Sequence, residues 1–442
     1  MQEWLWKSAA DLGRAIGAGQ IDPVALAETY LAAISEHPQR DRIYARTTQD
    51  RALAEAHAAR QRAATGHRLS VLDGVPISWK DLFDTAGTAT EAGSALLAGR
   101  MPAADALVLR NATQMGLVCL GKTHMTELAF SGLGVNPVTA TPPNVHNPAL
   151  APGGSSSGAA TSVAFGLAAA GIGSDTGGSV RVPSAWNDLV GLKTTAGRVS
   201  LQGVVPLCAR FDTVGPLCRT VEDAALIFAA LEGRRAPDLR GVSLQGRRFA
   251  ALNTVAMDDL RDAPEAAYRS ALDRLRAAGA EIVALDAPEV ADAMALAPML
   301  FAPEAYGQWH EQIEAAPHLM HQQVLERFRG GATVSGPEFV SAWLKLDQLR
   351  QTWAARVAGF DAVLLPATPN LPPDVARLES DAQYFVTENL LTLRNTRIGN
   401  LLGLSAVTLP TGVPSCGIML MGQAMGEDRL LRMAAAAEAA LA

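Results

Sequence analysis

The sequence has few cysteines and few charged residues, and each shortage excludes a class of protein. Charged residues make up 18% of the 442 and the formal net charge is −7, with no basic run, so direct nucleic-acid binding is not expected. The cysteines are Cys119, Cys208, Cys218 and Cys416. They lie far apart without C-x-x-C or metal-ligand spacing, which predicts buried, reduced thiols and no metal site.

Membrane and secretion signals are also missing. Residues 1–7 contain Glu3, Lys7 and two tryptophans, and lack the basic segment and apolar core of a signal peptide. No apolar run reaches the roughly 18–20 residues that a membrane span requires. We therefore expect no membrane contact and a cytoplasmic location.

Several catalytic and nucleotide-binding motifs are absent. Neither Gly-x-Gly-x-x-Gly nor the phosphate-binding Gly-x-x-x-x-Gly-Lys-Ser/Thr pattern occurs, so nucleotide binding is disfavoured and no cofactor is expected. The Gly-x-Ser-x-Gly turn of nucleophile-elbow hydrolases is missing too. None of the eight histidines lies in a glycine-serine motif, so a histidine base is a poor candidate.

The order of apolar segments predicts one large α/β domain over residues 1–442. Helical spacing at 9–16, 23–34 and 50–64 predicts an N-terminal helical layer within 1–66. Short strands and helices then alternate through glycine-rich turns in a core at 71–223, which favours a sheet covered by helices. No repeat or linker marks a second domain.

Further elements are predicted segment by segment. Helices are expected at 158–171, 222–232, 263–278 and through a helical region at 300–358, and strands at 117–120, 249–252, 282–285 and 362–366. The proline-rich segment 366–385 is predicted to be a surface loop.

Two glycine-framed serine motifs carry the chemistry. Residues 153–158 read Gly-Gly-Ser-Ser-Ser-Gly, and residues 175–181 read Asp-Thr-Gly-Gly-Ser-Val-Arg. In the second, the backbone N–H groups of Thr176, Gly177, Gly178 and Ser179 could point at one oxygen and form an oxyanion hole. A glycine-serine turn can equally be an ordinary loop or a phosphate site, so both readings stay open.

Lys80 ends the strand-like stretch Gly74-Val75-Pro76-Ile77-Ser78-Trp79-Lys80. A lysine can act as a base when burial lowers its pKa, and its apolar neighbours suit such burial. Ser155 could then relay a proton between Lys80 and Ser179. The alternative for Lys80 is an ordinary surface lysine.

These segments resemble the amidase signature family. The motifs occur in order at Asp73–Asp81, Gly121–Asn136, Pro152–Gly158, Asp175–Arg181, Gly191–Lys193 and Phe211–Pro216, and the similarity extends from about residue 5 to the C-terminal helix. The resemblance implies a mixed β-sheet surrounded by helices, frequent homodimerisation, and amide hydrolysis through an acyl-enzyme. It puts the catalytic lysine at Lys80, the bridging serine at Ser155 and the nucleophile at Ser179. Asp175 and Arg181 would shape the nucleophile loop, as an ion pair rather than as catalysts.

The substrate is open at this stage. Arg350, Arg394 and Arg397 are candidates for binding a small, carboxylate-bearing amide, and Ser131 is a candidate pocket residue, although packing and solvation explain each equally well. The competing function within the family is the glutaminase (A-type) subunit of a tRNA-dependent amidotransferase. Against it, Leu393 stands near the position where those subunits carry an acidic residue, so a free-standing amidase is favoured. An inactive, amidase-like scaffold is a third possibility.

Overall fold

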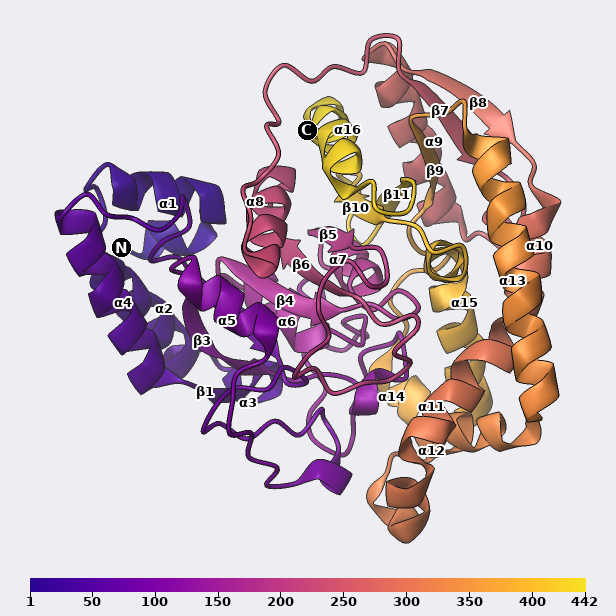
Figure 1. The fold of residues 1–442 in the computed structure, drawn as a ribbon, viewed down its shortest axis with the longest axis horizontal. Helices are drawn as coiled ribbons and strands as arrows, with labels where there is room; N and C mark the ends of the chain where they lie inside the picture. The colour runs from indigo at the N-terminus through magenta and orange to yellow at the C-terminus, as the bar shows by residue number, and fades with distance from the viewer.

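Eleven strands form one continuous sheet in the computed structural model, which describes residues 1–442 (Figure 1). From one edge to the other the strands are β1 (Tyr44–Thr47), β3 (Val118–Thr123), β2 (Pro76–Lys80), β4 (Ala170–Ser174), β6 (Val214–Cys218), β5 (Val190–Lys193), β10 (Ala406–Pro410), β11 (Gly417–Met421), β9 (Ala362–Pro366), β7 (Arg248–Leu252) and β8 (Glu281–Leu285).

Pairing in the sheet is mixed. Strand β2 runs parallel to both β3 and β4. Across the middle of the sheet each strand is antiparallel to the next, in the spatial order β4, β6, β5, β10, β11 and β9. Strands β9, β7 and β8 are again parallel. The predicted α/β fold with a mixed sheet is therefore confirmed.

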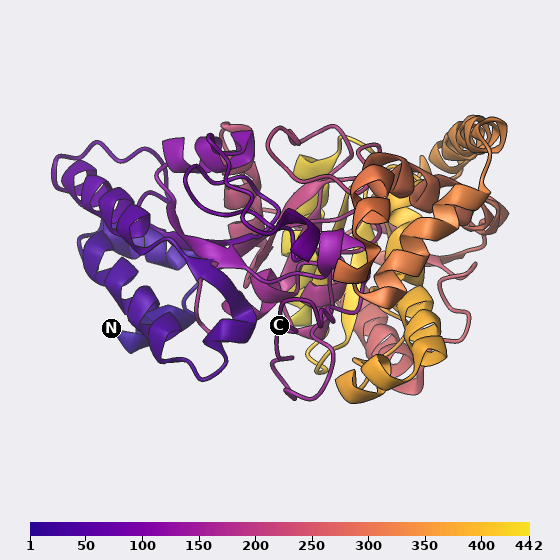
Figure 2. The ribbon, with the colours of Figure 1, turned by 90° about the horizontal axis from the view of Figure 1, so that it is seen from below.

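Helices surround the sheet (Figure 2). In chain order they are α1 (Ala9–Gly17), α2 (Pro23–Glu36), α3 (Arg40–Ile43), α4 (Gln49–Ala64), α5 (Leu107–Gln114), α6 (Ser157–Ala164), α7 (Arg181–Trp186), α8 (Val221–Glu232), α9 (Asp262–Ala277), α10 (Pro288–Ala295), α11 (Ala297–Ala315), α12 (Gln322–Arg329), α13 (Gly336–Val357), α14 (Val375–Ser380), α15 (Ala382–Leu401) and α16 (Glu427–Leu441), with short 3₁₀ turns η1 (Gln2–Trp6), η2 (Ala95–Leu97), η3 (Glu127–Ala129), η4 (Pro317–Leu319) and η5 (Gly330–Thr333).

Side-chain caps fix several helix starts. The hydroxyl of Ser8 accepts the N–H of Asp11 at the start of α1, and the Asp22 carboxylate accepts N–H groups in the same way at the start of α2. Ser335 and Glu338 form a reciprocal capping box at the start of α13. Each cap satisfies N–H groups that have no partner within the helix, and α1 and α2 begin at the residues expected from the sequence.

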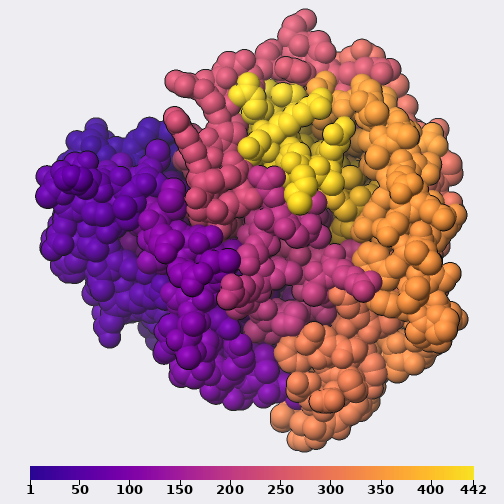
Figure 3. Space-filling model, viewed as in Figure 1, coloured from indigo at the N-terminus to yellow at the C-terminus, as the bar shows by residue number.

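One hydrophobic core joins the two ends of the chain. The main cluster of buried apolar side chains includes Leu5 at one end and Leu441 at the other. The N-terminal helices lie at one side of the molecule and the α11–α13 region at the opposite side (Figures 1 and 3). Because both pack on the same core, the single-domain arrangement is confirmed.

Two element predictions are wrong in part. Residues 158–171 do not form one helix, because α6 ends at Ala164 and Ala170 already begins β4. Residues 366–385 are not a plain surface loop, since Thr368 and Asn370 are buried and α14 and the start of α15 lie in this segment. The 1–66 layer also contributes an edge strand, β1, beside its helices.

The thiol prediction is confirmed, because all four cysteines are buried and none forms a disulfide. No helix combines the length and the apolar composition that a membrane crossing requires.

Close contact between α6 and β4 generates a prediction about stability. A Cβ at Gly171 would lie 2.5 Å from the carbonyl oxygen of Ala159, so backbone must move to admit it. Gly171→Ala is expected to destabilise the protein by about 1–3 kcal/mol, as overpacking does. At Gly307 in α11 a Cβ meets nothing within 4 Å, so Gly307→Ala is the control and is expected to be neutral or stabilising by up to about 1 kcal/mol. The midpoint of urea unfolding measures both; equal midpoints for the two variants would contradict the prediction.

Candidate active site

Lys80 lies at the end of β2 with its side chain fully buried. Its Nζ lies 2.7 Å from Ser155 Oγ and 2.8 Å from Ser174 Oγ. Burial lowers the pKa of Lys80 to about 7, and the nearby carboxylates of Asp212 and Asp175 oppose that shift. A surface lysine is therefore excluded, and this amine can exist in the neutral form near neutral pH.

Strand direction explains why these groups meet. Because β2 and β4 are parallel neighbours, Lys80 and Ser174 end their strands at the same edge of the sheet. Ser155 reaches that edge just before the first turn of α6, which packs against both strands. Carboxyl ends of parallel strands are a common location for ligand sites, and here they bring an amine and two hydroxyls together.

The second serine motif forms a tight turn between β4 and α7. Ser179 is 4% exposed, and its carbonyl accepts the N–H of Ser156 at 3.2 Å, which joins the two serine motifs. The hydroxyls of Ser155 and Ser179 are not hydrogen-bonded to each other. At Gly178 φ is +140°, and a Cβ would lie 2.1 Å from Thr396 Oγ1, so only glycine fits there.

The N–H groups of this turn divide into two sets. The N–H of Gly178 donates to Asp175 Oδ1 at 2.9 Å and is engaged there. Those of Thr176, Gly177 and Ser179 have no acceptor within the protein. The set of four N–H groups expected from the sequence is thus reduced to three that are free to bind an oxygen.

Asp175 and Arg181 form a fully buried, two-pronged ion pair, as the sequence predicted. The Asp175 carboxylate also accepts N–H groups from Val180 and from the Asn400 side chain. Burial alone would raise the pKa of Asp175, but the Arg181 guanidinium and these donors hold it well below its usual range. The pair therefore fixes the turn and takes no proton near neutral pH.

A small cavity opens beside Ser179. Its volume is about 20 Å³, room for about one water molecule, and its lining includes Ser131, Thr176, Gly177, Leu393 and Arg397. It adjoins a larger, mainly apolar groove of about 330 Å³ through four shared residues, which are Phe130, Phe301, Arg327 and Arg397. The cavity and the groove together offer space for a small organic molecule.

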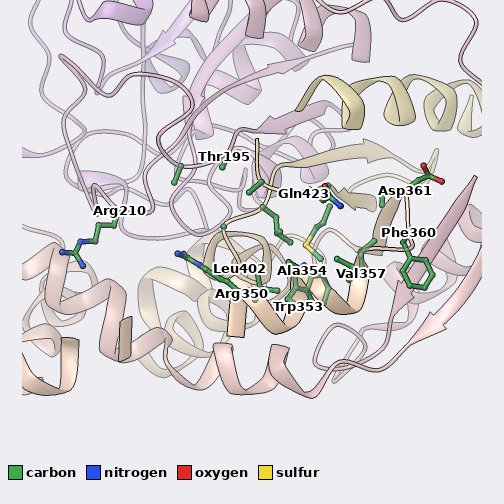
Figure 4. Close-up of a pocket in the computed structure, with 18 residues that line it drawn as sticks. Thr195, Arg210, Arg350, Trp353, Ala354, Val357, Phe360, Asp361, Leu402 and Gln423 are labelled. Carbon is green, nitrogen blue, oxygen red and sulfur yellow. The ribbon is translucent and has the colours of Figure 1, made fainter. Parts of the chain in front are cut away.

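The predicted binding residues fall in different places. Ser131 and Arg397 line the Ser179 cavity, and Ser131 Oγ donates to the Asn389 side chain at 3.0 Å. Arg394 lines a separate outer cavity that also touches Arg397. Arg350 lies in another pocket, of about 630 Å³, which shares no residue with the Ser179 cavity (Figure 4). It donates to the carbonyl of Leu401 there, so the structure does not bring Arg350 to the serines.

Three residues of the site were missed in the sequence. Ser174 hydrogen-bonds to Lys80, and its place directly before Asp175 was the available signal. Asp212, in the Phe211–Pro216 motif, accepts the Thr176 hydroxyl at 2.5 Å and the N–H groups of Leu207 and Cys208. Arg327 lines the Ser179 cavity from α12, and no local motif marks it.

Comparison with known proteins identifies the family. A family model described as Amidase matches residues 25–431. The chain belongs to the amidase family. It is 37% identical, over 85% of this chain and 83% of that protein, to a 2-amino-5-chloromuconic acid deaminase from Comamonas testosteroni. It is 31% identical, over 97% of this chain and 95% of that protein, to the A-type subunit of a glutamyl-tRNA(Gln) amidotransferase from Anaeromyxobacter sp. (strain K).

A solved peptide amidase from Stenotrophomonas maltophilia has the same fold, with a TM-score of 0.85, 27% identity, and coverage of 99% of this chain and 98% of that one. Membership of the amidase family makes this protein an amide-hydrolysing enzyme. The resemblance to the amidase signature family is therefore confirmed. The relatives of this protein are named for different substrates.

Ser174 generates a prediction about this amidase. Because its hydroxyl is one of two that hold the Lys80 amine, Ser174→Ala is expected to lower kcat about 10- to 100-fold through misplacement of that amine, with little change in KM. Ser174→Thr retains the hydroxyl and is expected to restore most of the activity. Steady-state kinetics of both variants measure this. A fall in kcat that Ser174→Thr does not reverse, or a change confined to KM, would contradict a positioning role for Ser174.

Proposed function

We propose that this amidase hydrolyses the C–N bond of a small, carboxylate-bearing amide through an acyl-enzyme on Ser179. The observation that carries the proposal is the buried Lys80 amine bonded to Ser155, next to a turn that presents Ser179 and three free N–H groups. A neutral amine, a bridging hydroxyl, a nucleophile and an oxyanion site are the components that acyl transfer needs.

The proposed steps balance without a cofactor. Neutral Lys80 accepts the Ser155 proton while Ser155 takes the proton of Ser179, whose Oγ bonds to the carbonyl carbon. The oxyanion is stabilised by the N–H groups of Thr176, Gly177 and Ser179. Collapse breaks the C–N bond as Ser155 gives its proton to the leaving amine and takes back the proton that Lys80 holds, which leaves Lys80 neutral again. Water then attacks the ester by the same proton path and releases the acid and Ser179.

Asp175 and Arg181 act in this proposal only on the shape of the turn. Thr396 donates to the Gly177 carbonyl at 2.8 Å, and the ion pair holds Gly178 and Val180. Donors fixed before the reaction stabilise the oxyanion without having to reorganise, which is the main source of their effect.

A carboxylate on the substrate is supported by the cavity and by a relative. Arg327 and Arg397 line the Ser179 cavity, and no aspartate or glutamate does. The relative from Comamonas testosteroni is named for an acid, 2-amino-5-chloromuconic acid. An arginine-lined cavity suits an anion, since guanidinium groups bind carboxylates strongly.

The second candidate is a glutaminase subunit, because relatives named as the A-type subunit of glutamyl-tRNA(Gln) amidotransferase match almost the whole chain. Glutamine carries an ammonium group that needs an anionic partner. At this cavity Leu393 offers only an apolar side chain. A free-standing hydrolase is therefore the better-supported proposal. An inactive scaffold is disfavoured, because nothing in such a role requires Lys80, Ser155 and Ser179 together. Homodimerisation and a cytoplasmic location stay predictions.

Ammonia release by the isolated protein tests the function. A panel of malonamate, succinamate, glutamine and an aryl acetamide is expected to show turnover of a carboxylate-bearing amide other than glutamine. Ser179→Ala is expected to abolish it, by about 10⁴-fold or more, because the nucleophile is lost. Activity confined to glutamine, or dependent on an added partner, would favour the glutaminase role instead. Unchanged activity in Ser179→Ala would refute the acyl-enzyme.

The state of Lys80 predicts the pH dependence. If the neutral amine is the base, kcat/KM rises with pH and levels off above about 7, since burial lowers the pKa of Lys80 to about 7. The Asp212 carboxylate favours the charged amine, so Asp212→Asn is expected to move the rise to lower pH. Asp292→Asn, on the exposed face of α10, is the control and should leave the profile unchanged. A rise that moves to higher pH in Asp212→Asn would contradict this assignment.

A further inference from the structure

Two arginines at the Ser179 cavity have no protein anion beside them. Arg327 on α12 and Arg397 on α15 line both the cavity and the adjoining groove. Neither forms a salt bridge or a side-chain hydrogen bond, whereas most other arginines of the chain are paired with carboxylates. Arg397 Nη2 is buried with no hydrogen-bond partner, and the Arg327 guanidinium lies 4.5 Å over the Phe130 ring.

This arrangement is unfavourable without a ligand. Burial lowers the pKa of Arg327 to about 9, with the like charge of Arg397 acting in the same direction, and burial also lowers the pKa of Arg397 to about 10. Guanidinium groups nevertheless keep their charge in proteins, so two positive charges line the same partly buried space. Repulsion between the two unpaired guanidinium groups is therefore unfavourable in the free protein, and bound anions would offset it.

No acidic side chain supplies that compensation. The one carboxylate that lines the groove belongs to Glu326, which is exposed and pairs with Gln322 on the same helix. The paired arginine two residues along, Arg329, donates instead to Glu314 on α11. The cavity therefore carries two positive charges without a protein counter-ion. A ligand with one carboxylate would leave one of these charges unpaired.

We propose that Arg327 and Arg397 each bind one carboxylate of the same molecule, so that the substrate class is an amide bearing two acidic groups. This inference rests on the proposed function, since it names the substrate of the same site. The groove of about 330 Å³ has room for a short carbon chain between the two acids. Its apolar lining, which includes Phe301 and Phe385, suits the chain itself.

Calorimetric binding to the Ser179→Ala protein tests the proposal without any need for turnover. The probes are trans,trans-muconate and sorbate, two six-carbon trans,trans-dienes in which a second carboxylate replaces a methyl group, with adipate and hexanoate as the saturated pair. Each diacid is expected to bind at least about 10-fold more tightly than its monoacid, since a charge-assisted pair contributes at least that factor. Equal affinity within both pairs, or no measurable binding of either diacid, would overturn the proposal.

Variants assign the two charges. In the Ser179→Ala background, Arg397→Gln is expected to weaken diacid binding about 10- to 100-fold and to leave the monoacids within about 3-fold. Arg397→Lys keeps a charge and is expected to recover part of the loss, which separates charge from misfolding. Arg329→Gln, an exposed position on the helix of Arg327, is the matched control and should change nothing. Equal weakening of monoacid and diacid by Arg397→Gln would mean one shared carboxylate and would overturn the two-acid assignment.

Failure of this inference can be told apart from failure of the proposed function. Labelling of Ser179 by a fluorophosphonate reports the nucleophile alone, and the control variant Arg329→Gln is expected to label as the unaltered protein does. Labelled protein that prefers no diacid would leave the amidase mechanism standing and remove the substrate class. Protein that binds diacids but is never labelled would leave the two-acid binding site standing and remove the acyl-enzyme mechanism.

Discussion

The buried ion pair between Asp175 and Arg181 is the interaction on which the site depends. Asp175 receives two bonds from Arg181 and further donors from Gly178, Val180 and Asn400, while Arg181 also donates to the carbonyl of Thr396. Breaking a buried pair by removing one partner typically costs about 3–5 kcal/mol, because the other charge is left uncompensated. The nucleophile turn is thus fastened to α15, the same helix that carries Arg397 and Leu393 into the cavity. The proposed nucleophile and the proposed substrate-binding residues are therefore held in place by the same helix.

The sheet provides the other half of the site. Lys80 and Ser174 need no special loop, since two parallel strands end together and hold their last side chains a hydrogen bond apart. Burial favours the neutral amine of Lys80, the form that the proposed mechanism uses as a base, and the Asp212 carboxylate limits how far its pKa falls. That carboxylate also accepts the Thr176 hydroxyl, so the residue that adjusts the amine touches the oxyanion turn as well.

The sequence predicts correctly those parts of the fold and of the site that are determined by short, contiguous motifs. Strand β2 with its terminal lysine, the two serine turns and the Asp175–Arg181 pair lie within short motifs, and strand β9 has the predicted limits at Ala362–Pro366. One helix over 158–171 is wrong, since alanine and glycine suit a buried helix and a buried strand equally, and α6 ends at Ala164, just before Gly166 with its φ of +72°. Arg327 is not among the arginines proposed from the sequence, because no local motif marks it. Which arginine reaches Ser179 is decided by how α12, α13 and α15 pack, which the sequence pattern does not contain.

The site contains a lysine, Lys80, and two arginines that line its cavity, Arg327 and Arg397. The different chemistry of the two side chains explains why each type stands where it does. Lysine loses its proton readily when desolvated, so the same burial that would make a poor anion-binding lysine makes Lys80 a good base. Arginine resists that loss, so the half-buried Arg327 and Arg397 stay charged. A lysine in either arginine position would recover only part of the carboxylate binding, because it lacks the planar, two-pronged guanidinium group. An arginine at position 80 could not accept the Ser155 proton. The residue types at positions 80, 327 and 397 are therefore not interchangeable, although all three carry a positive charge in water.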